Sequence, residues 1–300
     1  MPPLIEVEAI RSLADTQGLR AKFVEAERSA LRAVELADAH FGPSSTSSAL
    51  ARASLATIYS GMGRGEEADA TFRIAIDDLE RTLGADHGAR LTTMTNYALL
   101  VMNRGEPARA DELLAQVVET GERVYGEDHP ELGDFLQNYA SNLVHLGRLD
   151  EARVNFERAA QIFRDKVAED DFVRALPSLS LSEIHLVQQR PAMAETTSRE
   201  AIAILELALP PGHWVTAIAH CRLARALVQQ DRIEEAEPHF SSATASLLDQ
   251  AAFPEYRHTC LTAASAFYRS RGDTERVTEI DAALEDPDIA IWDRPAVSTD

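Results

Sequence analysis

The chain contains little cysteine, and this shortage already excludes some kinds of protein. Only two of its 300 residues, Cys221 and Cys260, are cysteine, and they do not form the closely spaced pairs typical of zinc sites. A small fold held together by several disulfides is therefore excluded. We expect both residues to be free thiols in a reducing cytoplasm, packed in an apolar helical neighbourhood.

Positive charge is also scarce. The chain has 29 Lys and Arg residues against 49 Asp and Glu, which gives a formal net charge of -20. Binding to nucleic acid or to anionic lipid requires clustered Lys and Arg, so neither is an expected partner. The acidity favours a solvated surface that keeps the protein soluble, and basic partners are the alternative.

Long apolar runs are missing as well. No stretch of 18 apolar residues occurs, which argues against a membrane-spanning helix. The first residues, MPPLIEVEAIRS, lack the basic and then apolar segments of a signal peptide. We therefore expect a cytoplasmic protein that does not bind membranes.

What the sequence does contain is a 42-residue internal period. Three columns of residues recur with this period. Two columns hold small residues, mostly alanine, and the third holds the Leu or Tyr that immediately precedes each member of the second. The columns are Ala26, Ala68, Ala110, Ala152, Ala194 and Ala236; Ala14, Ala56, Ala98, Ala140, Ser182 and Ala224; and Leu13, Leu55, Tyr97, Tyr139, Leu181 and Leu223.

Each period has the pattern of two amphipathic helices. Between residues 130 and 169, apolar residues recur with helical spacing, and Gly147 separates the first helix from the second. One such pair cannot bury its apolar face alone, so neighbouring pairs must stack. We predict an all-α fold, a right-handed α-solenoid of about seven helical hairpins, with the first helix of each hairpin on the concave wall. The units are placed near residues 7–44, 45–86, 87–128, 129–170, 171–212, 213–253 and 254–284, and a tail follows at 285–300.

The segment YGEDHPE, residues 125–131, could be a hydrolytic centre, half of a metal site or the joint between two helices. Related residues recur at the other joints, where Gly42 and Gly84 match Gly126 and His87 matches His129. Glycine readily ends a helix, and the residue three positions later can cap the next one. We therefore interpret the segment as a helix joint.

The repeat resembles the tetratricopeptide repeat, in the 42-residue form that is found in kinesin light chain. The resemblance rests on NYALLVMNRGEPARA at 96–110, on NYASNLVHLGRLDEA at 138–152, and on the joints GADHG and GEDHP. It covers roughly residues 7–284. It implies an interaction scaffold whose concave groove binds a segment of a protein or peptide partner.

Three classes of function were weighed. We favour a non-catalytic scaffold or adaptor that binds a partner peptide. The alternative is a peptide-sensing regulatory protein that changes shape on binding. An enzyme is disfavoured, because no nucleotide-binding, metalloprotease or nucleophile-elbow motif occurs in a useful context, and we expect no cofactor and no metal.

A polar stripe on the first helix of each hairpin is the candidate binding site. One column holds Ser12, Ser54, Asn96, Asn138, Ser180 and Arg222, and three residues later another holds Asp15, Thr57, Leu99, Ser141, Glu183 and Arg225. The family resemblance implies that Asn96 and Asn138 hold a peptide backbone. The predicted groove residues are Ser54, Asn96, Asn138, Ser141, Ser180, Arg222 and Arg225. Alternatively, Arg225 pairs with Glu183, and the asparagines bond neighbouring helices.

The last residues, EDPDIAIWDRPAVSTD, contain an apolar island between two prolines. Because a repeat array needs its last apolar face covered, we predict that this segment caps the seventh hairpin. Occupation of the groove and disorder are the alternatives.

Overall fold

The computed structural model describes residues 2–249 and 254–285, and these residues form fourteen α-helices and one short 3-10 helix. No strand occurs among them, so the predicted all-α repeat solenoid is confirmed. The chain divides into two compact units, residues 1–146 and 147–300. The predicted cap at 285–300 lies, apart from its first residue, outside the described residues and stays a prediction.

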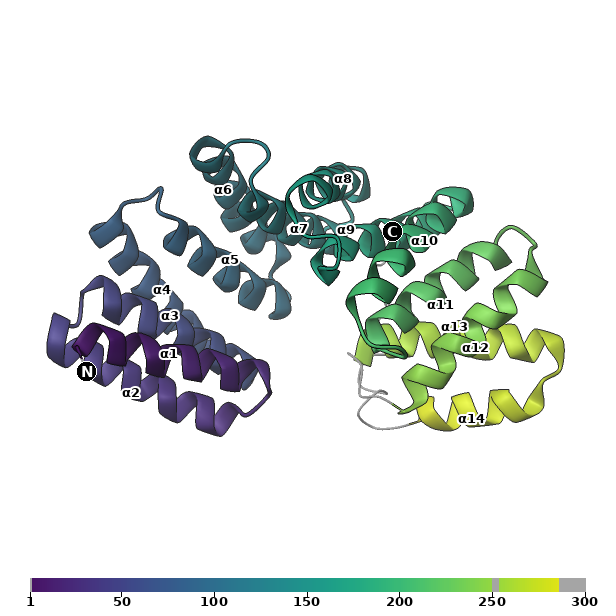
Figure 1. Cartoon of the computed structure of the whole chain (residues 1–300), viewed down its shortest axis with the longest axis horizontal. Helices are drawn as coiled ribbons and strands as arrows, with labels where there is room; N and C mark the ends of the chain where they lie inside the picture. The colour runs from purple at the N-terminus through teal and green to yellow at the C-terminus, as the bar shows by residue number, and fades with distance from the viewer. Residues whose placement is uncertain (1, 250–253, 286–300) are drawn as a thin grey trace. The chain divides into compact units, whose positions relative to one another are not determined.

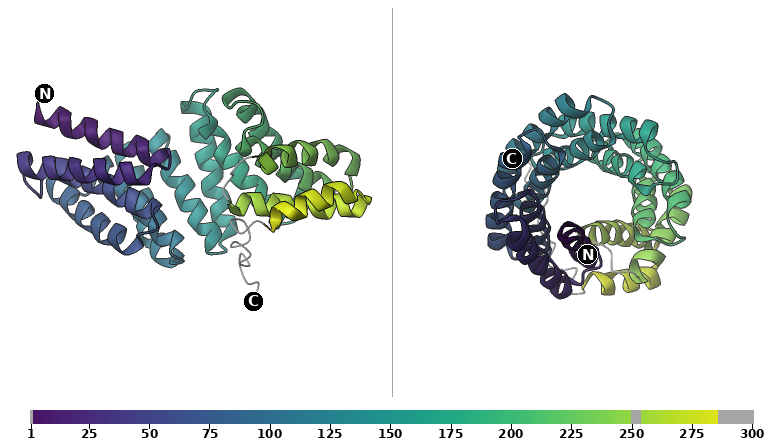
Figure 2. Two further views of the ribbon diagram at one scale, coloured as in Figure 1. Left: turned by 90° about the horizontal axis from the view of Figure 1, so that it is seen from below. Right: turned by 60° about the vertical axis from the view of Figure 1, so that its left-hand side comes forward.

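Unit 1 contains three complete hairpins and the first helix of a fourth. Successive hairpins lie side by side, so that α2 packs on α3 and α4 on α5 (Figures 1 and 2). The helices are α1 (Pro3–Leu19), α2 (Phe23–Phe41), α3 (Thr46–Gly61), α4 (Gly65–Leu83), α5 (Gly88–Asn103), α6 (Pro107–Tyr125) and α7 (Pro130–His145).

Unit 2 continues the same alternation. It departs from the pattern at its first complete hairpin, where the short helix α9 is preceded by the 3-10 turn η1. The elements are α8 (Leu149–Lys166), η1 (Phe172–Ala175), α9 (Leu176–Val187), α10 (Pro191–Ala208), α11 (Trp214–Val228), α12 (Ile233–Asp249), α13 (Pro254–Arg271) and α14 (Thr274–Leu284).

The joints between hairpins have the predicted geometry. Gly126 follows α6 with φ 83°, in the left-handed region that glycine adopts without strain. His129 then caps α7, because its ring Nδ1 accepts a hydrogen bond from the Glu131 backbone N–H at 3.2 Å. His87 caps α5 in the same way. The YGEDHPE segment is therefore a helix joint, as predicted.

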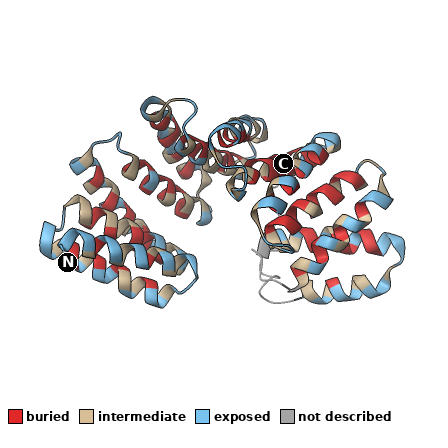
Figure 3. Cartoon of the chain, in the orientation of Figure 1, coloured by how far each residue is buried: buried red, intermediate tan, exposed pale blue. Residues whose placement is uncertain are grey.

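The repeating columns form the core. All six residues of the first alanine column are fully buried, and buried positions follow the faces where neighbouring helices meet (Figure 3). Larger side chains such as Phe72 and Phe156 fill the space beside them and are almost inaccessible. Leu13 is the exception in its column, at 51% exposure.

The expectation of free cysteines is wrong. Cys221 on α11 and Cys260 on α13 form a disulfide, with their Cα atoms 5.8 Å apart and both residues buried. This Cα separation is normal for a disulfide. The bond joins the first helices of two successive hairpins of unit 2, and we call it the α11–α13 disulfide.

Candidate functional site

A pocket of about 570 Å³ lies in unit 1, on the first helices of three successive hairpins. Its walls come from α1, α3 and α5, with one ring from α2. The lining residues are Arg11, Asp15, Gly18, Leu19, Phe23, Leu50, Ala53, Ser54, Thr57, Ile58, Gly61, Ala89, Thr92, Thr93 and Asn96. The volume falls in the range of about 300–1,000 Å³ that is usual for ligand sites.

Two of the predicted groove residues, Ser54 and Asn96, line this pocket. Ser54 is buried, and Asn96 is half-buried. Within the described part of the chain, the Asn96 amide makes no hydrogen bond, so its donor and its acceptor are both free to bind a ligand. The Thr57 hydroxyl between them donates to the carbonyl of Ala53, one turn earlier on its own helix, at 3.1 Å.

The pocket is close to neutral. Arg11 and Asp15 are its only charged lining residues, and they pair with each other, with Nη1 of Arg11 3.3 Å from Oδ2 of Asp15. The remaining lining residues are aliphatic, aromatic, hydroxylic, glycine or the Asn96 amide. A ligand in this pocket therefore meets no unpaired charge from the lining side chains.

Small residues make room for the pocket. A Cβ atom on Gly61 would lie 2.6 Å from Cε1 of Phe23, a distance that real Cβ atoms do not tolerate. Glycine at the end of α3 thus lets the Phe23 ring from α2 form part of the wall. Ala53 and Ala89 are the short side chains of α3 and α5 on the same surface.

Asn138 and Ser141 lie on α7, which contributes no residue to the pocket lining. Asn138 Nδ2 donates to the carbonyl of Asp134 at 2.9 Å, and Ser141 Oγ donates to that of Gln137 at 3.0 Å. Both bonds are local to α7. The Asn138 carbonyl oxygen makes no hydrogen bond to the rest of the described chain.

In unit 2 the predicted arginines are already paired. Arg225 donates to both Glu183 oxygens, at 2.7 and 2.9 Å, and Nε of Arg222 lies 3.2 Å from the same carboxylate. Arg222 is buried and also donates to the carbonyl of Leu179 at 2.7 Å. Burial alone would raise the pKa of Glu183, but the two guanidinium groups hold that pKa below its usual range.

The ion pair that was left open as an alternative is thus present. Ser180, in the same column, is half-buried and makes no hydrogen bond within the described residues. The predicted stripe therefore has two parts. The part in unit 1 is neutral and contains a pocket, and the part in unit 2 is charged, with Arg222 and Arg225 paired to Glu183.

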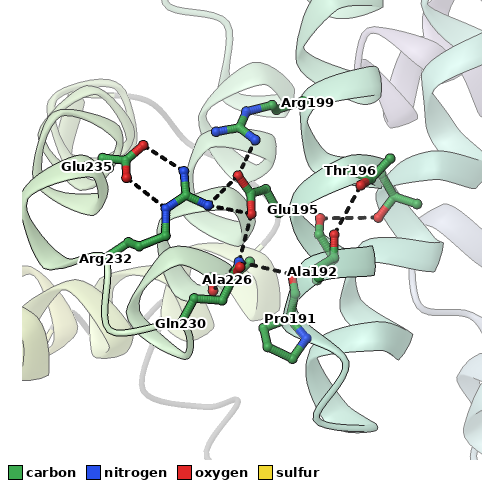
Figure 4. Close-up of polar contacts among 11 residues, drawn as sticks. Pro191, Ala192, Glu195, Thr196, Arg199, Ala226, Gln230, Arg232 and Glu235 are labelled. Carbon is green, nitrogen blue, oxygen red and sulfur yellow. Dashed lines mark hydrogen bonds and ion pairs between the residues drawn. The ribbon is translucent and has the colours of Figure 1, made fainter.

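Sequence reasoning missed a set of ion pairs at the turns within the hairpins, where a turn contacts the second helix of the previous hairpin. In unit 2, the buried carboxylate of Glu195 accepts hydrogen bonds from Arg199, from Gln230 at 2.8 Å and from Nη1 of Arg232 at 2.7 Å (Figure 4). Arg232 also binds Glu235, with Nε 2.7 Å from Oε1. Together these donors outweigh burial and lower the pKa of Glu195. We call these residues the Glu195 cluster.

The same arrangement occurs at the α3–α4 turn of unit 1, where Arg64 binds Glu67 and also Glu27 of the previous hairpin. At the α5–α6 turn the charges are exchanged, and Arg109 binds both Glu106 and Asp69. The pattern Arg-x-x-Glu at the start of the second helix was the available signal, since it recurs two repeats apart.

A second missed contact is a histidine pair in unit 2. Nδ1 of His220 on α11 lies 3.0 Å from Nδ1 of His239 on α12, and the rings stack with centroids 5.2 Å apart. Glu206 is 3.7 Å from the other nitrogen of His220. Burial lowers the pKa of both rings, and for His239 the neighbouring His220 lowers it further.

No group of three or more His, Cys, Asp or Glu residues that could hold a metal occurs among residues 2–249 and 254–285. Over the same ranges, no helix is both long enough and apolar enough to cross a bilayer.

Three family models match the chain, each described as tetratricopeptide repeat. They cover residues 48–88, 90–165 and 217–241, so both units are represented. No curated protein matches the chain in sequence.

Several solved structures share the fold. A Podosopora anserina putative kinesin light chain with nearly identical TPR-like repeats is 22% identical, with a TM-score of 0.57 over 65% of this chain and 92% of that one. BtubC (BKLC) from P. vanneervenii is 15% identical, with a TM-score of 0.63 over 83% and 94%. A Rap protein complexed with Competence and Sporulation Factor is 13% identical, with a TM-score of 0.63 over 95% and 75%.

Proposed function

Because the chain is a tetratricopeptide repeat protein, similar to the kinesin light chain type, we propose that it is a non-catalytic scaffold. It binds an extended segment of a protein partner in a concave groove whose centre is the unit 1 pocket. The observation that carries this proposal is the unbonded Asn96 amide in a preformed pocket shared by three successive hairpins.

Asn96 suits the backbone of an extended peptide. Its amide offers one acceptor and two donor hydrogens, which match a peptide N–H and C=O without specifying a side chain. Ser54 and Thr57 add hydroxyl groups on the neighbouring helix. On α7, the free carbonyl oxygen of Asn138 can extend the same row of contacts, and Ser141 lies one turn further along.

In this proposal Arg222 and Arg225 serve the stability of unit 2. Their guanidinium groups already satisfy the Glu183 carboxylate, so an acidic ligand would have to displace it. Removing Glu183 would leave the buried Arg222 with the carbonyl of Leu179 as its remaining hydrogen-bond partner and no carboxylate, which is unfavourable. Ser180 remains a candidate contact for a partner that extends beyond unit 1.

The alternative is a regulatory protein that changes shape when a peptide binds. The similarity in fold to the Rap protein, which was solved as a complex with Competence and Sporulation Factor, is the reason to retain it. Small-angle scattering with and without bound peptide separates the two. A rigid scaffold keeps its scattering profile, whereas a sensor changes it.

The net charge of -20 supports a protein partner rather than nucleic acid. The proposal is tested by affinity capture from native lysate with the wild-type chain and with Asn96→Ala. A matched control is Asn155→Ala, which removes an amide from α8, where it bonds only to the carbonyl of Glu151 within the described structure. We expect capture to be lost with the first variant and kept with the second. Equal capture by both would contradict the groove model.

A further inference from the structure

We propose that the unit 1 pocket selects an uncharged segment from within a partner chain and takes up one of its aliphatic side chains. This inference rests on the proposed function and adds the chemistry of the ligand. It follows from the charge, the shape and the polar groups of the pocket.

Charge is the first restriction. Arg11 and Asp15 neutralise each other, and no other lining residue is charged. A charged ligand side chain placed here would lose its hydration without gaining an opposite charge, which is unfavourable. The pocket therefore disfavours acidic and basic side chains alike.

The same argument disfavours a chain end. A free C-terminal carboxylate is bound well by an available guanidinium or ammonium group, and the only cation of the lining is already paired. A free N-terminal amine would likewise require an unpaired carboxylate. The segment that fits is thus internal to the partner.

Shape favours an aliphatic side chain. Leu50 and Ile58 of α3 and the Phe23 ring form an apolar wall, and the short residue Ala53 leaves space beside it. Leu19, at the end of α1, also lines the pocket yet is 90% exposed. Such an exposed apolar side chain gains stability when an apolar ligand covers it.

This neutral character is specific to the first hairpins. In the columns that hold Ser54, Thr57 and Asn96 in unit 1, unit 2 has the Glu183, Arg222 and Arg225 cluster. Uncharged segments should therefore bind unit 1 in preference to unit 2.

A selection from a phage-displayed library of random octapeptides tests the inference, with the whole wild-type chain as bait. The best sequence is then made as an acetylated and amidated peptide, together with versions in which its aliphatic residue becomes Asp or Lys. Affinities are measured by fluorescence polarisation. We expect the charged versions to bind at least about tenfold more weakly, which corresponds to about 1.4 kcal/mol.

A charge introduced into the pocket provides the matched test. Thr57 is exposed, so Thr57→Asp should fold normally. This variant should bind the Lys peptide more tightly than the wild type does, and the uncharged peptide more weakly. Asn155→Ala should leave all affinities unchanged.

Four results would overturn the inference: no enrichment, enriched peptides with a fixed charged residue, a preference for a free terminus, or binding that Thr57→Asp leaves unchanged. Tight binding of a synthetic peptide of residues 286–300 would instead assign the pocket to the chain's own C-terminal segment. If native capture depends on Asn96 while the selected peptides are charged, only this inference fails. If native capture ignores Asn96, the proposed function fails.

Discussion

Replacing Glu195 tests whether the Glu195 cluster stabilises the contact between two successive hairpins. The carboxylate is 7% exposed and accepts hydrogen bonds from Arg199, Gln230 and Arg232. Arg232 keeps a second carboxylate partner, Glu235, so Glu195→Ala does not leave it unpaired. The substitution then removes charge-assisted hydrogen bonds. We expect a coupling free energy between Glu195 and Arg232 of about 1.5–3 kcal/mol.

The coupling is measured with a double-mutant cycle of Glu195→Ala and Arg232→Met. Both tryptophans of the chain lie between residues 147 and 300, so urea unfolding followed by tryptophan fluorescence reports on unit 2. The control cycle removes the pair Arg164–Glu200, which also joins two hairpins at 2.9 Å but is 50% and 39% exposed. We expect a coupling free energy below about 1 kcal/mol for that exposed pair.

The coupling should also depend on pH. Because the folded pKa of Glu195 is lowered, its contribution is complete above the unfolded value of about 4.3 and disappears as the pH falls through the folded pKa. Additive effects of the two substitutions at neutral pH, or a coupling no larger than that of the control pair, would refute the reasoning.

Three further predictions concern single features. His220 and His239 have lowered pKa values, so the unfolded chain takes up protons more readily; unit 2 should lose stability as the pH falls below about 6.5. His239→Asn should flatten this dependence of the fluorescence melting temperature, whereas replacing the exposed His40 in unit 1 should not. Reducing the α11–α13 disulfide should destabilise unit 2 by about 2–4 kcal/mol in urea unfolding, and an unchanged midpoint would contradict this. Gly61→Ala should displace the Phe23 ring and weaken peptide binding about tenfold without loss of circular dichroism signal; unchanged affinity would show that the ring does not shape the pocket.

Much of the fold could be predicted because the information is local and repeated. The alanine columns specify which helix faces pack, and the glycine and histidine residues of each joint specify where helices end and begin. Leu13 shows that a column does not specify burial by itself, since Leu13 is exposed while the other members of its column are buried or half-buried.

Contacts between helices of different hairpins were harder to predict. Cys221 and Cys260 are 39 residues apart, which is three fewer than the 42-residue period. They therefore do not occupy equivalent positions of their repeats, and their contact depends on how the two helices pack. The pairing of His220 with His239 likewise depends on how α11 packs against α12. A column alignment compares equivalent positions, and neither contact joins equivalent positions.

The candidate site lies between these cases. Its columns placed Ser54 and Asn96 on one surface, and both line the pocket. The columns could not decide between a ligand role and an internal ion pair for Arg225, because Glu183 belongs to the same column one repeat earlier. That choice depends on side-chain distances, which the sequence alone does not contain.

The central claim is that a partner protein binds at the unit 1 pocket, and site-specific photocrosslinking tests it most directly. A photoreactive residue is placed at Thr57 in the pocket or at Ile74, an exposed position on the second helix of the same hairpin. The chain is irradiated in its native lysate. We expect a covalent partner adduct from Thr57 that disappears with Asn96→Ala, and none from Ile74. An adduct from Ile74 with none from Thr57 would contradict it.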